Sequence, residues 1–442
     1  MGVRAFVLFL LAFLCVSSTA QAGPVLMISI DGLRPADVLD ANKRGLKIPN
    51  LSAFVKNGAS ATGVRGVLPT VTYPNHTTLI TGLSPAQHGI ANNTTFDPLQ
   101  KNMEGWYWYE SDIKGETLWD AVHDIHRIVA NIDWPVSVGA ASIDYNIPEY
   151  WRAWTPDDLK LVRALSTPGL IPRLEHETGS SFASTYNNTP DSDTARARFV
   201  EKLIDISFPQ LMTLHLVSLD HYQHIYGPGS PEARAALEQI DTAVGELLAE
   251  ARKIEPDVTV AIVSDHGFAP VSHDVNLMAA FAEAGLITVD ARRKIASWEA
   301  MPWGAGGSAA IVLAHPDDQA VKDKVSALLA KLAADPTSGV AQVIDKREIE
   351  ARGAAKEASF WMDFKIGYQA GRNLSGALVT PSTQKGSHGF FPDNKEMRAA
   401  FMIVGPGIKK KSLGDIDMRD IAPTLAKILQ VPFPGAAGKP LF

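Results

Sequence analysis

Cysteine is almost absent from this sequence, because Cys15 is the only one in 442 residues. Cys15 lies in an N-terminal segment that we expect to be removed, so the remaining chain has no thiol. Such a chain gains no stability from disulfides, and its hydrophobic core must suffice. Any metal site must use His, Asp, Glu or hydroxyl ligands, because no thiolate is available.

Long hydrophobic runs are also missing after the first 22 residues. Before that point, Arg4 precedes an apolar run at residues 5–16, and Ala20-Gln21-Ala22 completes the pattern of a signal peptide cleaved after Ala22. The run is shorter than the roughly 20 residues that a membrane span needs. An uncleaved anchor helix is the alternative, whereas Leu14 disfavours a lipid anchor on Cys15. We therefore expect a secreted or periplasmic protein without a stable membrane anchor.

Basic residues are not in excess, since 41 Lys and Arg stand against 48 Asp and Glu, for a formal charge of −7. No run of Lys or Arg is long enough to indicate polyanion binding. We therefore expect no docking to nucleic acid, and no feature of the sequence indicates an obligate protein partner.

The sequence does contain an alternation of strand-like and helical segments. Continuous apolar runs predict strands buried on both faces at residues 25–30, 211–219, 258–263 and 399–404. Apolar residues three or four positions apart predict helices at 193–206, 231–253 and 317–334. Ser230 and Pro231 are typical of a helix start, with Ser as the cap and Pro at the first helical position.

Strands that alternate with helices predict the α/β class, with a mostly parallel central sheet flanked by helices on both faces. No internal repeat or long linker divides the chain, so we expect one domain over residues 23–442. Residues 133–188 are rich in Trp, Tyr and Pro and show little periodicity. We interpret this range as a small insertion or cap near the active site.

Acidic residues follow three of the predicted strands. Asp31 follows the first, Asp220 the second, and Asp265 with His266 the third. Ligands of open α/β sheets bind beyond the carboxyl ends of the strands. Three acidic groups there would repel one another strongly unless a pair of divalent cations neutralised them. For any single Asp the alternative is a helix cap, and His388, in a loop flanked by glycines, is by itself more typical of a surface histidine.

A second candidate cluster surrounds Thr72. Pro74 is well placed as the first residue of a helix that runs through Leu79 and is closed by Gly82. Thr72 then lies just before a helix N-terminus, where the dipole and free N–H groups favour an anion. A hydroxyl there, beside a metal that lowers its pKa, can attack phosphorus. The alternative is that Thr72 only caps the helix.

Two motifs connect these residues with a known family. One reads Pro-Thr-x-Thr-Tyr-Pro-Asn-His at 69–76 and continues as Thr-Gly-Leu-x-Pro-x-x-His-Gly at 81–89. The other combines Asp-x-x-x-His at 220–224, Asp-His at 265–266 and His-Gly at 388–389. With them, the sequence resembles the nucleotide pyrophosphatase/phosphodiesterases of the alkaline phosphatase superfamily, as a secreted, bacterial-type member. The matching stretches follow the family's order over nearly the whole chain after residue 24.

The resemblance implies an alkaline-phosphatase-like fold and an enzyme that hydrolyses phosphodiester or pyrophosphate bonds of small-molecule substrates. It implies two zinc ions per chain, one held by Asp31, Thr72, Asp265 and His266 and the other by Asp220, His224 and His388. Thr72 would form a covalent phosphothreonine. The Asn93 amide would donate to a phosphate oxygen, with Asn92 as the alternative.

Two departures from the family pattern concern Gln223 and Val136. The family often has Gly at both positions, and Val136 lies in the predicted cap, so leaving-group preference stays open. Tyr73, Tyr145 and Tyr150 are candidate substrate-binding residues that would stack on a base. Ordinary packing is an equal alternative for Tyr73 and the favoured one for Tyr145 and Tyr150. The natural substrate is not specified by the sequence.

Rival functions share the same metal ligands. A phosphomonoesterase and a phosphonate hydrolase of the superfamily are the enzymatic alternatives, and a non-catalytic zinc protein that binds phosphorylated ligands is the non-enzymatic one. A diester is favoured because Asn93 stands where a monoesterase needs a stronger donor for a dianionic phosphate. Binding without turnover is disfavoured because Thr72 and all the expected ligands are present.

Overall fold

A sheet of eight strands forms the centre of the molecule. The computed structural model describes residues 23–102, 105–150, 155 and 157–442, so the predicted signal peptide with Cys15 lies outside the described residues. The strands follow the order β19-β2-β18-β7-β1-β6-β4-β5. Their bounds in that order are Lys411–Ser412, Ala59–Ser60, Phe401–Val404, Thr259–Val263, Val25–Ile30, Leu211–Leu216, Val129–Ile132 and Tyr145–Ile147.

The middle of this sheet is parallel, as predicted. β1 pairs in parallel with β6 and β7, and β4 pairs in parallel with β6 and β5. Only β18 runs antiparallel to its neighbours β7 and β2 in this sheet, among the residues described. All six residues of β1 are buried, which explains its continuous apolar sequence.

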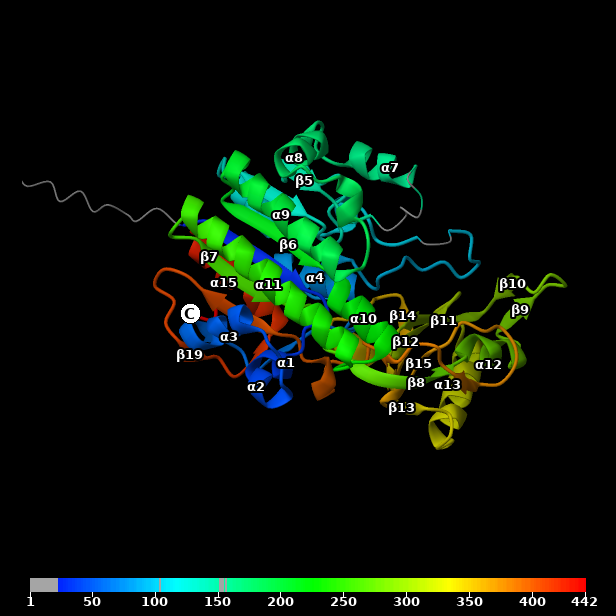
Figure 1. Cartoon of the computed structure of the whole chain (residues 1–442). Coiled ribbons are helices and arrows are strands. Elements are labelled where there is room, and N and C mark those ends of the chain that lie inside the picture. Colours follow the sequence, from blue (N-terminus) through cyan, green and yellow to red (C-terminus); the bar gives the residue numbers. More distant parts are fainter. Residues whose placement is uncertain (1–22, 103–104, 151–154, 156) are drawn as a thin grey trace, which may run out of the picture.

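Helices cover both faces of the sheet. Leu26, Ile28 and Ile30 of β1 pack into one core with α3, α9 and α11, whereas Val25 and Met27 face a second core with α4, α6 and α15. In Figure 1, α9 and α11 lie side by side across the sheet. The bounds are Pro49–Asn57 for α3, Thr72–Thr81 for α4, Leu118–His123 for α6, Pro190–Ser207 for α9, Pro231–Ile254 for α11 and Ile421–Leu429 for α15.

The start of α11 follows the predicted capping pattern. The Ser230 side chain accepts a hydrogen bond from the backbone N–H of Ala233, and Pro231 occupies the first turn. Helix α13 (Gln319–Ala334) begins two residues later than predicted, because Asp318 accepts from the N–H of Val321 and caps it.

A second, smaller sheet was not predicted. It is antiparallel and has the order β11-β12-β14-β13, and it shares a separate core with β8, α12 and α13. In Figure 1 this part lies beyond one end of the main sheet. The bounds are Ala300–Ala305 for β11, Ser308–Leu313 for β12, Val340–Asp345 for β13, Ala358–Phe364 for β14, Ala269–Val275 for β8 and Leu277–Glu283 for α12. Strand β17 (Gly386–Ser387), just before His388, pairs with β8.

The predicted cap at residues 133–188 is partly built into the main sheet. Its strand β5 forms the sheet edge beside β4. Helices α7 (Asp158–Leu165) and α8 (Leu170–Thr178) follow, and buried residues of both join the core that contains α9. The weak periodicity hid a short buried strand, so this range is not wholly an insertion.

Other predicted boundaries also differ from the structure. The strand predicted at 211–219 ends at Leu216, and helix α10 (Ser218–Tyr226) begins at once. Ser218 and Leu219 are buried in the first turn of α10, so burial rather than strand structure explains the apolar run. Helix α4 begins at Thr72, two residues before the predicted start at Pro74.

Shorter elements complete the chain. The remaining helices are α1 (Pro35–Leu39), α2 (Ala41–Arg44), α5 (Pro85–His88) and α14 (Lys346–Ala351). The remaining strands are β3 (Gly63–Arg65), β9 (Ile287–Val289), β10 (Ile295–Trp298), β15 (Gly367–Ala370), β16 (Val379–Pro381) and β20 (Asp415–Asp417). Every helix in the described part of the chain is too short or too polar to cross a bilayer.

Candidate active site

The predicted metal ligands converge beyond the carboxyl ends of β1 and β7. Asp31 directly follows β1, and Asp265 and His266 follow β7 after a single serine. His388 follows β17, which pairs with β8 in a further sheet of the order β15-β8-β16. We expected Asp220 at a strand end, but it lies in the first turn of α10. The structure thus brings side chains from four distant segments to one place.

The first group contains Asp31, Asp265 and His266, whose ligand atoms lie within 4.8 Å of one another. His266 Nε2 is 3.1 Å from Asp265 Oδ2 and 3.4 Å from Asp31 Oδ1. Thr72 Oγ1 lies 3.5 Å from the same nitrogen. These are the four residues that the resemblance assigns to one ion.

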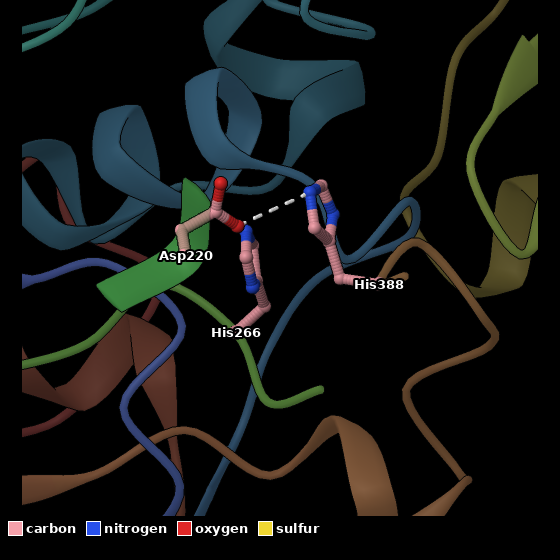
Figure 2. A group of neighbouring side chains, drawn as sticks. All are labelled: Asp220, His266 and His388. Carbon is pink, nitrogen blue, oxygen red and sulfur yellow. Dashed lines mark ion pairs between the residues drawn. The ribbon is translucent and has the colours of Figure 1, made fainter. Parts of the chain in front are cut away.

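The second group contains Asp220, His266 and His388. His388 Nε2 lies 3.6 Å from Asp220 Oδ1, and His224 Nε2 lies 3.5 Å from Asp220 Oδ2. Asp220 and His224 are neighbours because they stand four residues apart on α10. Figure 2 shows the Asp220 carboxylate directed toward the His388 ring, with the His266 ring beside it. His266 therefore borders both groups, although the resemblance assigns it to only one.

Backbone carbonyl groups fix the protonated nitrogen of each histidine. His224 Nδ1 lies 2.9 Å from the Gly386 oxygen, His266 Nδ1 3.0 Å from the Gly267 oxygen, and His388 Nδ1 3.3 Å from the Thr70 oxygen. A carbonyl oxygen only accepts, so Nδ1 carries the proton when the ring is neutral and Nε2 offers a lone pair. Burial lowers the pKa of His266 and takes that of His388 to about 4, which keeps both rings neutral.

The Nε2 lone pairs of His266 and His388 face carboxylate oxygens that accept no hydrogen bond from the described residues. Among the residues described, Asp31 Oδ1, Asp220 Oδ1 and Asp265 Oδ2 are buried without a hydrogen-bond partner. Acceptors that face acceptors at such distances repel one another unless a cation or a proton lies between them. The set of imidazole nitrogens, carboxylates and one hydroxyl fits zinc, which prefers these ligands where thiolates are absent.

The acidic residues are crowded together. Burial, followed by the charges of Asp265 and Asp220, raises the pKa of Asp31 well above its usual value. Burial also raises the pKa of Asp265 to about 7. A bound divalent cation would lower these pKa values and favour the ionised carboxylates.

Thr72 stands in the first turn of α4 but does not cap it. Val71 occupies the cap position, and no side-chain cap bond is formed there. Gly82 closes the helix, as predicted, with a φ of +66°. The geometry therefore argues against the alternative in which Thr72 is a helix cap, and it leaves the hydroxyl beside His266.

Asn93 approaches the same helix end. Its carboxamide oxygen accepts the backbone N–H of Tyr73 at 2.9 Å, so its NH2 group is the part that can donate to a substrate. Asn92 instead donates from Nδ2 to the Gly304 oxygen, and its own oxygen accepts the N–H of Asn93. The contacts of Asn92 hold the loop, which favours Asn93 for the substrate contact.

The three candidate substrate-binding tyrosines do not share one surface. Tyr73 is completely buried, and its ring packs against Trp106 and Trp108 at centroid distances of 5.1 and 6.1 Å. Tyr150 is also buried and packs against Trp108, while Tyr145 is a partly buried residue of β5. Tyr73 has no exposed ring face, so the geometry favours packing over stacking on a base.

Two buried residues behind the site escaped the sequence analysis. His215, on β6, lies 3.0 Å from Asp31 Oδ2 through Nε2 and 2.8 Å from Glu149 Oε2 through Nδ1. A histidine inside the apolar run of β6 was the available signal. Glu149 had none, because 66 residues separate it from His215.

Comparison with known proteins agrees with this geometry. The profile of the type I phosphodiesterase / nucleotide pyrophosphatase family matches residues 25–391. A pyrophosphatase/phosphodiesterase of Schizosaccharomyces pombe, described as uncharacterised, is 26% identical over 92% of this chain and 77% of its own length. The human bis(5'-adenosyl)-triphosphatase is 26% identical over 58% of this chain, and the match spans only 50% of that protein.

A solved structure supports the fold. Human ectonucleotide pyrophosphatase / phosphodiesterase 5 superposes with a TM-score of 0.65 at 20% identity, covering 94% of this chain and 97% of that one. The predicted alkaline-phosphatase-like fold is thereby confirmed. Because the family profile covers most of the sequence, the chain belongs to the type I phosphodiesterase / nucleotide pyrophosphatase family of the alkaline phosphatase superfamily and is an enzyme of that kind.

Proposed function

We propose that the enzyme uses two zinc ions and a covalent phosphothreonine on Thr72 to hydrolyse phosphodiester or pyrophosphate bonds of small nucleotides. The observation that carries this proposal is the set of unpartnered carboxylate oxygens facing histidine lone pairs beside the Thr72 hydroxyl. A nucleotide substrate is further supported by an inactive variant of murine ectonucleotide pyrophosphatase / phosphodiesterase 5, which has a related fold and was solved in complex with AMP.

In this proposal each side chain has one task. Asp31, Asp265, His266 and Thr72 hold one ion, and Asp220, His224 and His388 hold the other. Bound zinc would supply Lewis-acid stabilisation of phosphate oxygens and a lowered pKa for the attacking hydroxyl. Thr72 Oγ1 attacks phosphorus and expels the leaving group, and water then attacks the phosphothreonine. The Asn93 NH2 group donates to a non-bridging oxygen.

The stereochemical course at phosphorus tests the covalent step. Two in-line displacements, each with inversion, give net retention with a chiral phosphorothioate diester. Net inversion would mean direct attack by water, and Thr72 would lose its role as nucleophile.

Substitution of Thr72 separates catalysis from stability. Thr72→Ala should lower turnover by several orders of magnitude, because the nucleophile is gone. Since Thr72 makes no cap bond, its loss should cost less than the roughly 1 kcal/mol of a typical helix cap. Thr72→Ser keeps the attacking oxygen and should retain partial activity. Equal turnover of Thr72→Ala and the natural enzyme would refute the proposal.

The metal and the bond type are tested separately. Elemental analysis should find about two zinc per chain, and full activity in a metal-free sample would rule out the metal-dependent mechanism. Catalytic efficiency on an aryl methyl phosphodiester should exceed that on the matching monoester by well over tenfold, or about 1.4 kcal/mol. The opposite ranking would favour the monoesterase alternative.

We also propose that the chain is exported after cleavage at Ala22, as the N-terminal pattern predicts. N-terminal sequencing of protein recovered from the medium or periplasm should begin at Gly23. Recovery of the intact chain in the cytoplasm would contradict this.

A further inference from the structure

A line of buried polar groups runs from Asp31 to helix α4. His215 stands between Asp31 and Glu149, at 3.0 Å from one carboxylate and 2.8 Å from the other. Glu149 Oε1 accepts a hydrogen bond of 2.6 Å from the Tyr73 hydroxyl. Tyr73 follows Thr72 directly, and its backbone N–H is bound to Asn93. One chain of contacts therefore joins a candidate zinc ligand to the candidate nucleophile and its neighbour.

The two oxygens of Asp31 have different surroundings. Oδ2 is held by His215, whereas Oδ1 has no hydrogen-bond partner among the described residues and lies 3.4 Å from His266 Nε2. A donor on Oδ2 fixes the rotation of the carboxylate, and this fixed rotation directs Oδ1 toward the metal position. Groups that hydrogen-bond to metal ligands in this way tune metal affinity.

The burial of the network also fits this task. The His215 ring lies between two buried carboxyl groups, and His215 and Glu149 are only 1% and 2% exposed. Two further contacts fix the ring: the Asp133 carbonyl lies 3.2 Å from Nδ1, and His76 packs at a centroid distance of 4.4 Å.

From these contacts we infer that His215 and Glu149 form a positioning pair that orients Asp31 for metal binding and couples it to helix α4. This inference rests on the proposed zinc-dependent function and adds two residues to its machinery. Neither residue touches the substrate or the metal position in this role. His215 acts through Asp31, and Glu149 acts through His215 and Tyr73.

Zinc affinity provides a readout that does not depend on turnover. The metal-free protein and its variants are titrated with zinc in competition with a chromogenic chelator. His215→Gln keeps a donor at the Nε2 position and should bind zinc nearly as well as the natural protein. His215→Leu removes both donors and should weaken at least one of the two zinc sites by about 10- to 100-fold. Glu149→Gln keeps the shape but replaces one of the two accepting oxygens, which face Tyr73 and His215, with an NH2 group, and should have an intermediate effect.

A matched control separates positioning from simple stability. Thr213 is on the same strand and the same face as His215, is fully buried, and bonds to Asn131 at 2.9 Å. Thr213→Val should lower the denaturation midpoint but leave both zinc affinities unchanged. If His215→Leu does not fold, the contrast between Glu149→Gln and Thr213→Val decides the question.

The possible outcomes are distinct. Failure of the natural protein to bind zinc would refute the proposed function and this inference together. Two zinc ions in the natural protein, with unchanged affinity in His215→Leu and Glu149→Gln, would refute the positioning role alone. The positioning role would be supported if His215→Leu binds zinc more weakly while His215→Gln and Thr213→Val bind it nearly as well as the natural protein. The visible spectrum of the cobalt-substituted protein should change in the same variants, because it reports ligand geometry directly.

Discussion

Val136 has a backbone conformation that suits glycine. Its φ is +58°, and its side chain is fully buried in the core beside α9. A left-handed conformation costs an L-amino acid roughly 1–2 kcal/mol, and a branched side chain suffers most. This strain accounts for the glycine that the resembling family often has here. The buried contacts of the Val136 side chain offset the strain in this chain.

The strain at Val136 predicts that Val136→Gly is more stable than Val136→Ala, the reverse of the usual order of stability. Val136→Ala and Val136→Gly both lose the buried side chain, but only alanine keeps the Cβ atom that opposes a positive φ. The glycine variant should therefore be the more stable by about 1 kcal/mol, measured by urea denaturation. At Val138, which is buried without a positive φ, the alanine variant should be the more stable. A more stable Val136→Ala would show that the loop relaxes without strain.

Helix α10 is tied to the loop after β1 by a side chain that glycine could not replace. Gln223 is buried, and its Nε2 donates to the Gly32 oxygen at 3.0 Å. Gly32 follows Asp31, while Gln223 lies between Asp220 and His224. The bond thus links two elements that carry candidate ligands of different ions. Gln223, the other departure from the family pattern, therefore adds a structural contact.

Loss of this bond should be measurable without a change of volume. Gln223→Met keeps the length of the side chain but leaves the Gly32 oxygen without that donor. The free energy of unfolding should fall by about 1–3 kcal/mol, the usual cost of an unsatisfied buried polar group. Gln223→Glu, which reverses the hydrogen-bonding character, should cost at least as much. An unchanged denaturation midpoint in Gln223→Met would show that the bond contributes nothing.

Strand β14 supports the loop that carries His388. Asp363 on β14 accepts the backbone N–H of Phe391 at 3.0 Å and the Gln342 amide at 3.3 Å. Burial raises the pKa of Asp363 to about 6. Because the folded pKa lies above the unfolded value, the folded state binds the proton more tightly. The stabilising effect of protonation is complete below about pH 4 and is lost as the pH rises through 6.

A pH series should reveal this effect. Asp363→Asn stays neutral, so its stability relative to the natural protein should rise by on the order of 2–3 kcal/mol between pH 4 and pH 7. Urea unfolding of both chelator-treated proteins at each pH measures the difference, in which the other titrating groups cancel. A difference that is constant with pH would mean that the Asp363 carboxyl is not perturbed.

Local signals explain which elements could be predicted from the sequence. The apolar run of β1 and the capped, periodic α11 are each encoded within one segment, so their positions follow from residue order alone. Asp31 and Asp265 could be placed because strand ends of a parallel sheet share one edge. In the smaller sheet, the apolar run of β12 begins with Ser308, Ala309 and Ala310, which are weak strand signals, and one partner strand, β14, lies far away in the sequence.

The contacts around Asp31 show why the rest of the site was missed. His215 is 184 residues from Asp31, and its role depends on side-chain distances that no local pattern records. The same holds for His266, which lies between two ligand groups although sequence resemblance assigns it to one.

At the scale of the molecule, the site connects the main sheet to the part that contains β8 and the smaller sheet, which share one core. Asp31 and Asp265 follow strands of the main sheet, whereas His388 arrives through β17, which pairs with β8. Gly389 permits this approach, because a Cβ atom there would lie 1.8 Å from the Ala305 oxygen of β11. Ions held by ligands from both parts would therefore act as links within the folded state.

Metal removal should lower the thermal stability of the whole molecule. A ligand that binds only the folded state contributes about 4 kcal/mol when its concentration is 1,000 times its Kd. Chelation should therefore lower the Tm by several degrees, and added zinc should restore it. His388→Ala removes the ligand from the smaller part, so zinc should raise the Tm of this variant less. His176→Ala, at a side chain that is 87% exposed and distant from these ligands in the sequence, should respond as the natural protein does. If zinc raises the Tm of all three proteins equally, His388 does not hold the metal, and the link between the two parts of the molecule must be sought elsewhere.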